Sequence, residues 1–237
     1  LESIEELREA QQKLIDQERL AVVGQMASHV AHEIRNPLVS IGLLSKNIAR
    51  RHKNDQQTHF KATTIFEEVT RLEDILRSLM DYAGPKSSRR LELQEVDVNE
   101  LVADTVKQFR QMMLSRDIRC RTELHEGLPP VRLDRRQIKQ ALINLLKNAI
   151  EAITREDGRV DLATCFDEEY VYVQLADNGP GMSEETVNKL FTPFFTTKRT
   201  GSGLGMAVIK KIIDEHGGQV HIDSELGRGT SFTVQLP

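Results

Sequence analysis

The chain has 237 residues, of which 29% are charged and 39% hydrophobic, and its formal net charge is −4 at pH 7. This length suits one large or two modest globular domains. The small negative charge, with basic residues interspersed among acidic ones, argues against a nucleic-acid partner. No apolar run approaches the ~20 residues that span a bilayer, and the N-terminus does not resemble a signal peptide. A cytoplasmic segment is therefore expected, and whether a longer protein is a membrane-bound sensor is left open.

The first predicted element is one long helix over residues 1–52. Apolar or small residues recur at alternating intervals of three and four between Leu20 and Ile48, which is the spacing of a coiled coil. An earlier apolar seam, within residues 1–20, is out of register with the later one. Because a break in register changes coiled-coil winding, residues 1–20 are expected to be an incoming signalling coiled coil or, equally, a frayed helix end.

His32 is expected to be displayed on this helix and not packed in its seam. It falls at the heptad position farthest from the seam, with Glu33 beside it and Asn36 one turn further on. A lone exposed histidine is usually only solvated, but here a carboxylate and an amide share its side of the helix. A zinc-protease helix is excluded because Asn36 stands where a second histidine is needed. The stretch His-Glu-Ile-Arg-Asn-Pro-Leu at 32–38 resembles the phosphoacceptor box of bacterial two-component sensor histidine kinases.

Polar residues between 51 and 58 predict a turn, and apolar residues at intervals of three and four from Ile65 to Ala83 predict a second helix. Each helix carries one apolar stripe, so the two alone cannot enclose a core. A homodimeric four-helix bundle is the simplest way to bury both stripes. We therefore expect a helical dimerisation domain over residues 1–86, followed by a polar linker that begins at residue 84 and ends at residue 90.

From residue 91 to residue 237 the pattern changes to mixed helices and strands, which predicts a second, α/β domain. Helices are predicted at about 99–114, at 135–153 after the N-cap Asp134, and at 203–216. Strands are predicted at about 118–124, 159–166 and 170–177, and as a pair over 219–237. Cys120 and Cys165 fall in strands without metal or disulfide spacing and are expected to be reduced core residues.

Two asparagines on the 135–153 helix are candidate ligands of a cation. Asn144 and Asn148 are one turn apart on the same face, with Lys147 between them in sequence. Their neutral amide oxygens suit Mg²⁺ when its remaining ligands are phosphate and water. Two helical asparagines alone, however, are more often plain surface groups.

Two glycine-rich turns are candidate parts of the same site. Asp177 ends a strand just before Gly179 and Gly181, where glycine lets a ligand approach the backbone and a carboxylate can accept a hydrogen bond from an adenine amino group. The second turn opens a helix whose first amides would cradle phosphate. It lacks the Gly-Lys-Ser/Thr of a Walker loop, and neither turn is diagnostic alone. The residues of this second turn are Gly201, Gly203, Leu204 and Gly205.

Between these turns lies an aromatic stretch at 191–195, followed by Lys198 and Arg199. It is interpreted as a lid that folds over a nucleotide and brings cations to its phosphates, or else as a loop anchored by core aromatics. In order and spacing, the pieces resemble the N box, first glycine box, F box and second glycine box of the GHKL superfamily, with a further glycine box that ends at Thr230. The resemblance implies a Bergerat-type α/β sandwich that binds ATP and Mg²⁺.

Taken together, the resemblances imply an ATP-dependent histidine kinase. His32 would attack the γ-phosphorus, Glu33 would take the ring proton, and the phosphoryl group would pass to an aspartate of a response-regulator receiver domain. The resemblance also implies a second activity, because relatives with Asn or Thr at the position of Asn36 commonly dephosphorylate the regulator as well. Two other classes of protein stay open. A GHKL ATPase that acts as a conformational clamp would explain the nucleotide motifs but would give no function to the His32 face. A coiled-coil adaptor would explain the helices up to residue 83 but nothing after them.

Overall fold

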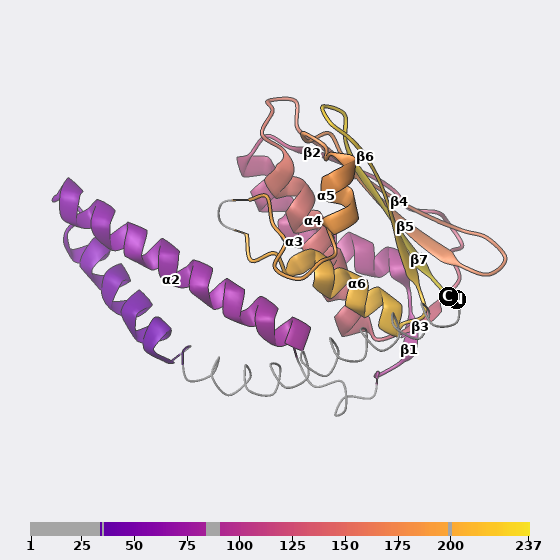
Figure 1. Ribbon diagram of the computed structural model, residues 1–237, viewed down its shortest axis with the longest axis horizontal. Coiled ribbons are helices and arrows are strands. Elements are labelled where there is room, and N and C mark those ends of the chain that lie inside the picture. The colour runs from indigo at the N-terminus through magenta and orange to yellow at the C-terminus, as the bar shows by residue number, and fades with distance from the viewer. Residues whose placement is uncertain (1–33, 35, 84–90, 199–200) are drawn as a thin grey trace, which may run out of the picture. The chain divides into compact units, whose positions relative to one another are not determined.

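In the computed structural model, residues 34, 36–83, 91–198 and 201–237 are described (Figure 1). The chain divides into two compact units, one formed by Leu1–Arg89 with Thr197–Ser202 and the other by Arg90–Thr196 with Gly203–Pro237. His32, Glu33 and Arg199 lie outside the described residues, as do segment 1–20 and the predicted linker. Among the described residues, no helix has the length and apolar character needed to cross a bilayer.

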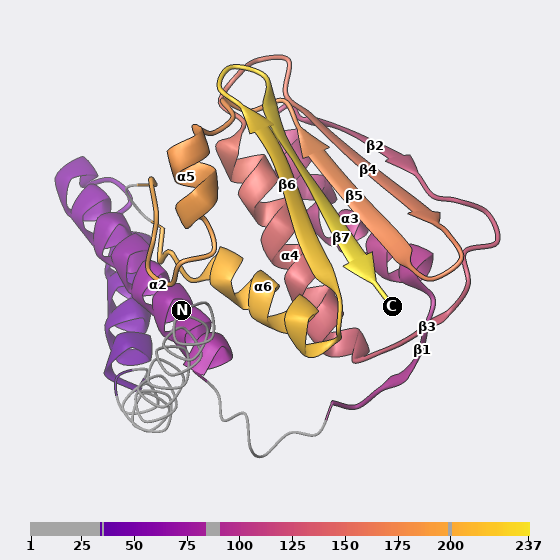
Figure 2. The same ribbon diagram turned by 45° about the vertical axis from the view of Figure 1, so that its right-hand side comes forward.

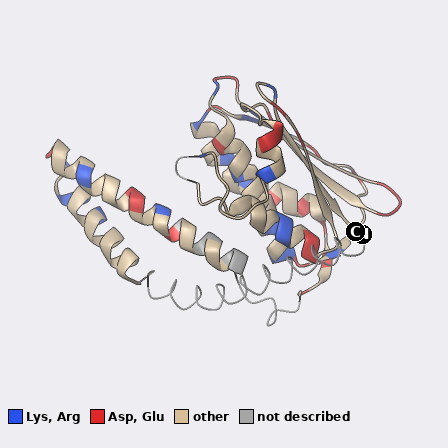
Figure 3. Cartoon of the chain, in the orientation of Figure 1, with Lys and Arg blue, Asp and Glu red and all other residues tan. Residues whose placement is uncertain are grey.

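The helical unit is a hairpin, as the sequence predicts (Figure 1). Residues 36–51 are helical, 52–54 form the turn, and α2 spans Gln56–Ala83. Asp55 caps α2 by accepting hydrogen bonds from the Thr58 amide at 3.2 Å and from the Thr58 hydroxyl at 2.6 Å. These bonds, the hydroxyl first, hold the pKa of the Asp55 carboxyl below its usual range. Acidic and basic side chains are interspersed along α2 (Figure 3).

The two helices of the hairpin pack on each other through one residue beside the predicted seam, Leu38, and one within the predicted stripe of the second helix, Val69. Leu38 and Val69 are buried, and a Cβ added at Gly42 would lie 3.2 Å from Val69 Cγ1. Most of the predicted seam is uncovered in the single chain, with Leu44 63% exposed. The other exposed apolar residues of the predicted stripes are Ile34, Ile41, Ile48, Ile65 and Leu72. The hairpin contact therefore leaves an apolar face for another surface.

The α/β unit is a sandwich of one mixed sheet and a layer of helices (Figure 2). The five-stranded sheet has the order β2-β4-β5-β7-β6, with β2 and β4 parallel and the other neighbours antiparallel, and β1 pairs with β3 separately. Helices α3, α4 and α6 cover one face (Figure 2). The elements are β1 (Gln94–Val96), α3 (Val98–Ser115), β2 (Arg119–Glu123), β3 (Val131–Leu133), α4 (Arg135–Ala152), β4 (Arg159–Phe166), β5 (Val171–Asp177), α5 (Glu184–Lys189), α6 (Gly205–Glu215), β6 (Gln219–Glu225) and β7 (Gly229–Leu236).

The core lies between the sheet and these helices because alternate strand residues face them. Val173 and Leu175 of β5 are 1% and 2% exposed, and Leu145 and Ile150 of α4 are as deeply buried. Full burial of such a side chain contributes roughly 1.5–3 kcal/mol to folding. The apolar positions predicted for β5 and α4 are therefore confirmed, and they fix the faces on which Asp177 and the asparagines of α4 stand.

Some expectations are wrong in detail. The helix predicted from residue 203 begins at Gly205, because Gly203 has φ +69, which no helix allows. Cys165 is not a core residue: it is half-buried on the face of β4 away from the helices. Cys120, opposite the buried Val160, faces the helices, and its burial raises the pKa of its thiol.

Candidate functional site

Helix α4 carries the two asparagines and is fixed at its start by Asp134. The Asp134 carboxylate accepts hydrogen bonds from two first-turn amides of α4, each at 3.1 Å. Asn144 is half-buried and accepts a hydrogen bond from Gln140 Nε2 at 3.3 Å. One turn on, Asn148 Nδ2 lies 3.1 Å from Met206 Sδ, in the first turn of α6. The Asn148 side chain therefore lies between α4 and the start of α6.

The third candidate on α4, Lys147, is half-exposed on the same helix. Its Nζ lies 3.9 Å from Glu151 Oε1, one turn further along. A pair this long and this exposed contributes little to stability.

The loop after β5 is tied down by close contacts. Asp177 is 9% exposed, and its Oδ1 accepts a hydrogen bond from the Gly179 amide at 2.8 Å. A Cβ added at Gly179 would lie 2.7 Å from that same oxygen. At Gly181, with φ +66, an added Cβ would collide with the carbonyl oxygen of Glu225 in β6. Gly181 therefore requires glycine, whereas a side chain at Gly179 would displace the Asp177 carboxylate.

Thr230 stands directly across the β5–β7 ladder from Asp177. It is 8% exposed, on the helix-facing side of the sheet. Directly opposed residues on one face have Cβ atoms about 4.5–5.5 Å apart. A buried carboxylate and a buried hydroxyl thus lie side by side, in a part of the sheet where a glycine loop lets another molecule approach.

The start of α6 provides the third part of the site. Gly203 has φ +69, and a Cβ there would collide with the backbone of Phe194. Leu204, the N-cap residue, is fully buried, and its apolar side chain makes no capping hydrogen bond. Gly205 then begins α6, with an added Cβ 3.9 Å from Asn148 Nδ2. The first turn of this helix therefore lies beside Asn148 of α4, and an anion is favoured at such a helix start.

The structure brings together most of the residues that the sequence singled out. Ala152 at the end of α4 lies against Gly179, and Asn148 lies against the start of α6, so one face of α4 links the Asp177 loop to the second glycine turn. Lys198 and Gly201 belong to Thr197–Ser202, which groups with the helical unit, and we assign them no position at the site. The aromatic stretch is irregular and starts from turns, with Phe194 60% exposed at φ +66.

In the helical unit, Asn36 is the one predicted catalytic residue that the structure describes. It is exposed and lies in the helix, with its carbonyl oxygen accepting a hydrogen bond from Ser40 Oγ at 3.2 Å. Its side chain is thus on the surface, as the heptad register predicts.

Sequence reasoning missed Ser224 and Met206. Met206 contacts Asn148, and Ser224 Oγ lies 2.9 Å from Thr230 Oγ1. Ser224 occupies an ordinary alternating position of β6, so no local pattern distinguishes it. Its contact depends on how the β6–β7 hairpin closes over the Asp177 loop.

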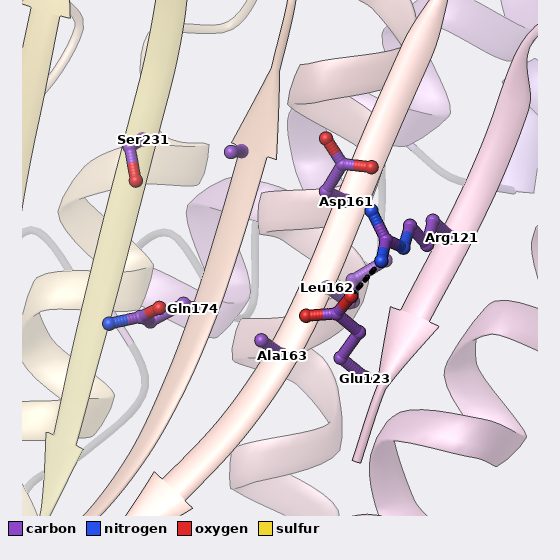
Figure 4. A pocket seen from close by; sticks show the side chains of 8 residues that line it. Arg121, Glu123, Asp161, Leu162, Ala163, Gln174 and Ser231 are labelled. Atoms are coloured by element: carbon purple, nitrogen blue, oxygen red, sulfur yellow. Dashed lines mark ion pairs between the residues drawn. The ribbon is translucent and has the colours of Figure 1, made fainter.

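A shallow depression of about 220 Å³ lies on the opposite face of the sheet (Figure 4). Its lining includes Arg121, which forms an ion pair with Glu123, and also Asp161, Gln174 and Ser231. Ser231 and Thr230 are neighbours in β7 but point to opposite faces. The depression is therefore separate from the Asp177 site, and its charges are paired in a solvent-exposed setting.

Comparison with known families covers both units. A family described as the His Kinase A (phospho-acceptor) domain matches residues 22–87. A second, described as the Histidine kinase-, DNA gyrase B-, and HSP90-like ATPase, matches residues 133–237. The chain is 35% identical over 227 residues to the sensor histidine kinase ZraS of Escherichia coli K12, covering 96% of this chain and 48% of ZraS. It is 32% identical to sporulation kinase E of Bacillus subtilis, covering 99% of this chain and 31% of that kinase.

Solved structures agree with this. The catalytic domain of histidine kinase ThkA is 37% identical, with a TM-score of 0.57, over 62% of this chain and 95% of that domain. ThkA in complex with the response regulator TrrA gives 33% identity and a TM-score of 0.69 over 98% of this chain and 66% of ThkA. Full-length ShkA in complex with AMPPNP gives 26% identity and a TM-score of 0.73 over 90% of this chain and 45% of ShkA. The chain spans about half of the length of ZraS and about a third of that of sporulation kinase E.

Proposed function

The chain belongs to the sensor histidine kinases, and from this premise we propose that it phosphorylates its own His32 with ATP bound in the α/β unit. The observation that carries the proposal is the shared face of α4. That face joins a buried acceptor pair, Asp177 with Thr230, to the start of α6 beside Asn148. An acceptor pair suits an adenine amino group, and a helix start suits a polyphosphate.

The residues of α4 fit a Mg²⁺ ion that is held mainly by the nucleotide. Asn144 and Asn148 offer neutral amide oxygens, and the described residues include no cluster of His, Cys, Asp and Glu that would hold a metal by itself. The anionic ligands would then come from the triphosphate, and the ion would offset the charge of the transferred phosphoryl group. Lys147, and from the predicted lid Lys198 and Arg199, would add positive charge around the phosphates.

In the reaction, a neutral ring nitrogen of His32 attacks the γ-phosphorus as the bond to the β–γ bridging oxygen breaks. Glu33 accepts the proton that the ring loses, and ADP leaves. The phosphoryl group then passes from His32 to an aspartate of a response-regulator receiver domain. Because an unperturbed histidine side chain has a pKa of ~6.5, much of the imidazole is neutral and nucleophilic at pH 7.

Asn36 has a proposed second role in dephosphorylating the regulator. It lies four residues after His32, so it projects from nearly the same side of the helix, and its amide would hold a water in line with a phosphoaspartate. Decay of the purified phosphoregulator measures this role: Asn36→Ala should slow the decay to the rate in buffer while autophosphorylation persists. If Asn36→Ala loses autophosphorylation but leaves the decay of the phosphoregulator unchanged, the proposed phosphatase role of Asn36 is wrong.

A labelling experiment separates the kinase from the clamp and the adaptor. After incubation with γ-labelled ATP, a histidine kinase retains label that is lost in acid and stable in base. A clamp ATPase releases labelled phosphate and stays unlabelled. An adaptor also stays unlabelled, and it releases no phosphate. The match of residues 22–87 to a phosphoacceptor family supports the first outcome.

A further inference from the structure

The hydroxyl of Ser224 connects three parts of the nucleotide site. It lies in β6 and is half-buried. Its oxygen accepts a hydrogen bond from the Met182 amide at 2.9 Å, in the loop that follows Asp177. It donates to the Gly229 carbonyl at 3.0 Å and lies 2.9 Å from Thr230 Oγ1. One side chain therefore touches the glycine loop, the hairpin turn and the hydroxyl beside Asp177.

The direction of the contact between Ser224 and Thr230 follows from counting protons. An amide can only donate and a carbonyl can only accept, so two of the three contacts of Ser224 have a fixed direction. The single hydroxyl proton of Ser224 is used by the Gly229 carbonyl. All three contacts are satisfied only if the Thr230 hydroxyl donates its proton to Ser224.

This arrangement fixes what Thr230 offers to a ligand. With its proton turned toward Ser224, the Thr230 oxygen has only lone pairs left. Asp177, opposite Thr230 across the ladder, is an acceptor as well when ionised. The base end of the site then presents two acceptors and no donor from this pair.

We propose that Ser224 is a positioning residue that selects a purine with an amino group at position 6 over one with a carbonyl oxygen there. An amino group donates to this pair, whereas a carbonyl oxygen would face two acceptors without a proton between them. Sites built to hydrogen-bond a group reject analogues that cannot make the bond far better than apolar pockets reject a size difference. The inference rests on the proposed binding of a nucleotide beside Asp177 and Thr230, and it assigns the base selectivity of that site to a residue that does not itself touch the base.

The test compares ADP with inosine diphosphate, which differs in carrying a carbonyl oxygen at position 6. Binding of each to the full chain is measured by titration calorimetry with Mg²⁺, without phosphoryl transfer to complicate the result. In Ser224→Ala the Thr230 hydroxyl is released and can donate to the carbonyl oxygen. The ratio of the two dissociation constants should therefore narrow by about threefold to tenfold, the range expected for one hydrogen bond.

Two controls separate selection from a general loosening of the hairpin. Ser231→Ala removes the neighbouring hydroxyl on the opposite face of β7 and should leave the ratio unchanged. Ser224→Thr keeps the hydroxyl and should keep the ratio. In a Thr230→Val background, which has no hydroxyl to orient, Ser224→Ala should change the ratio no further.

Several outcomes would overturn the inference. Equal weakening of ADP and inosine diphosphate binding by Ser224→Ala, which leaves the ratio unchanged, would mean a structural role only, and unchanged dissociation constants for both nucleotides would mean no role. A further change in the Thr230→Val background would show that Ser224 does not act through Thr230. If Ser224→Ala does not fold, Thr230→Val alone must narrow the ratio, and an unchanged ratio there overturns the inference. If the unaltered chain binds neither nucleotide, the proposed function fails instead.

Discussion

Asp177 shapes the loop that follows β5, and it is also the residue proposed to recognise the adenine base. One carboxylate oxygen accepts the Gly179 amide at 2.8 Å, which holds the turn. The side chain is also 9% exposed at the end of a buried strand, where an unsatisfied charge would be costly.

Asp177→Asn should weaken binding of both ATP and adenosine about tenfold to a hundredfold, because a buried hydrogen bond to a charged acceptor contributes ~1.5–3 kcal/mol. Calorimetry with the two ligands measures this. The matched variant Asn148→Asp should leave adenosine binding intact and disturb ATP binding, since the Asn148 side chain on α4 contacts the first turn of α6. Unchanged adenosine binding in Asp177→Asn would show that the adenine assignment is wrong.

At the scale of elements, the second glycine turn is held against the aromatic loop by backbone contact. Gly203 has φ +69, and a Cβ added there would collide with the Phe194 backbone, so the loop between the two residues is closed at its base. The position of the first amides of α6 depends on this closure.

Gly203→Ala should therefore weaken ADP binding at least about tenfold, because it displaces the α6 amides that are proposed to bind the phosphates. Adenosine has no phosphate, so its binding should stay within about twofold. Gly227→Ala is the control: it has φ +83, and an added Cβ would meet nothing within 4 Å. It carries the same backbone strain without the clash. Equal effects of the two variants on ADP binding would mean that strain, and not the contact with Phe194, is responsible.

The sequence predicts the long elements well and the short ones poorly. Helix α4 and strands β4 and β5 match their predicted ranges within one or two residues because each has a clear apolar period and a cap or glycine at its end. Strands β1 and β3 have three residues each, too few for a period, and the sequence does not predict them. The Ser224 contacts are equally out of reach, since they arise only when the hairpin folds over the Asp177 loop.

At the scale of the whole molecule, the exposed seam of the hairpin is proposed to be covered by a second copy of the chain. Leu44, Ile48 and Ile65 are apolar and exposed at intervals that match the predicted coiled-coil stripe. Contiguous apolar surface of this kind marks an interaction site. A homodimeric four-helix bundle would bury both stripes.

Leu44→Glu should convert the dimer to a monomer, as measured by sedimentation or light scattering, because it would place charges within the bundle. Leu114→Glu is the matched control: Leu114 is also 63% exposed but lies on α3 of the other unit. A dimer that survives Leu44→Glu, or one that is lost with Leu114→Glu, would place the interface elsewhere.

Phosphorylation of His32 is tested most directly by the label that two histidine variants retain from γ-labelled ATP. His32→Gln should abolish the acid-labile label, while ADP binding stays unchanged because the nucleotide site lies in the α/β unit. His29→Gln, three residues earlier and without a neighbouring carboxylate, should remain labelled. Label that persists in His32→Gln, or that disappears in His29→Gln while ADP still binds, would contradict the account.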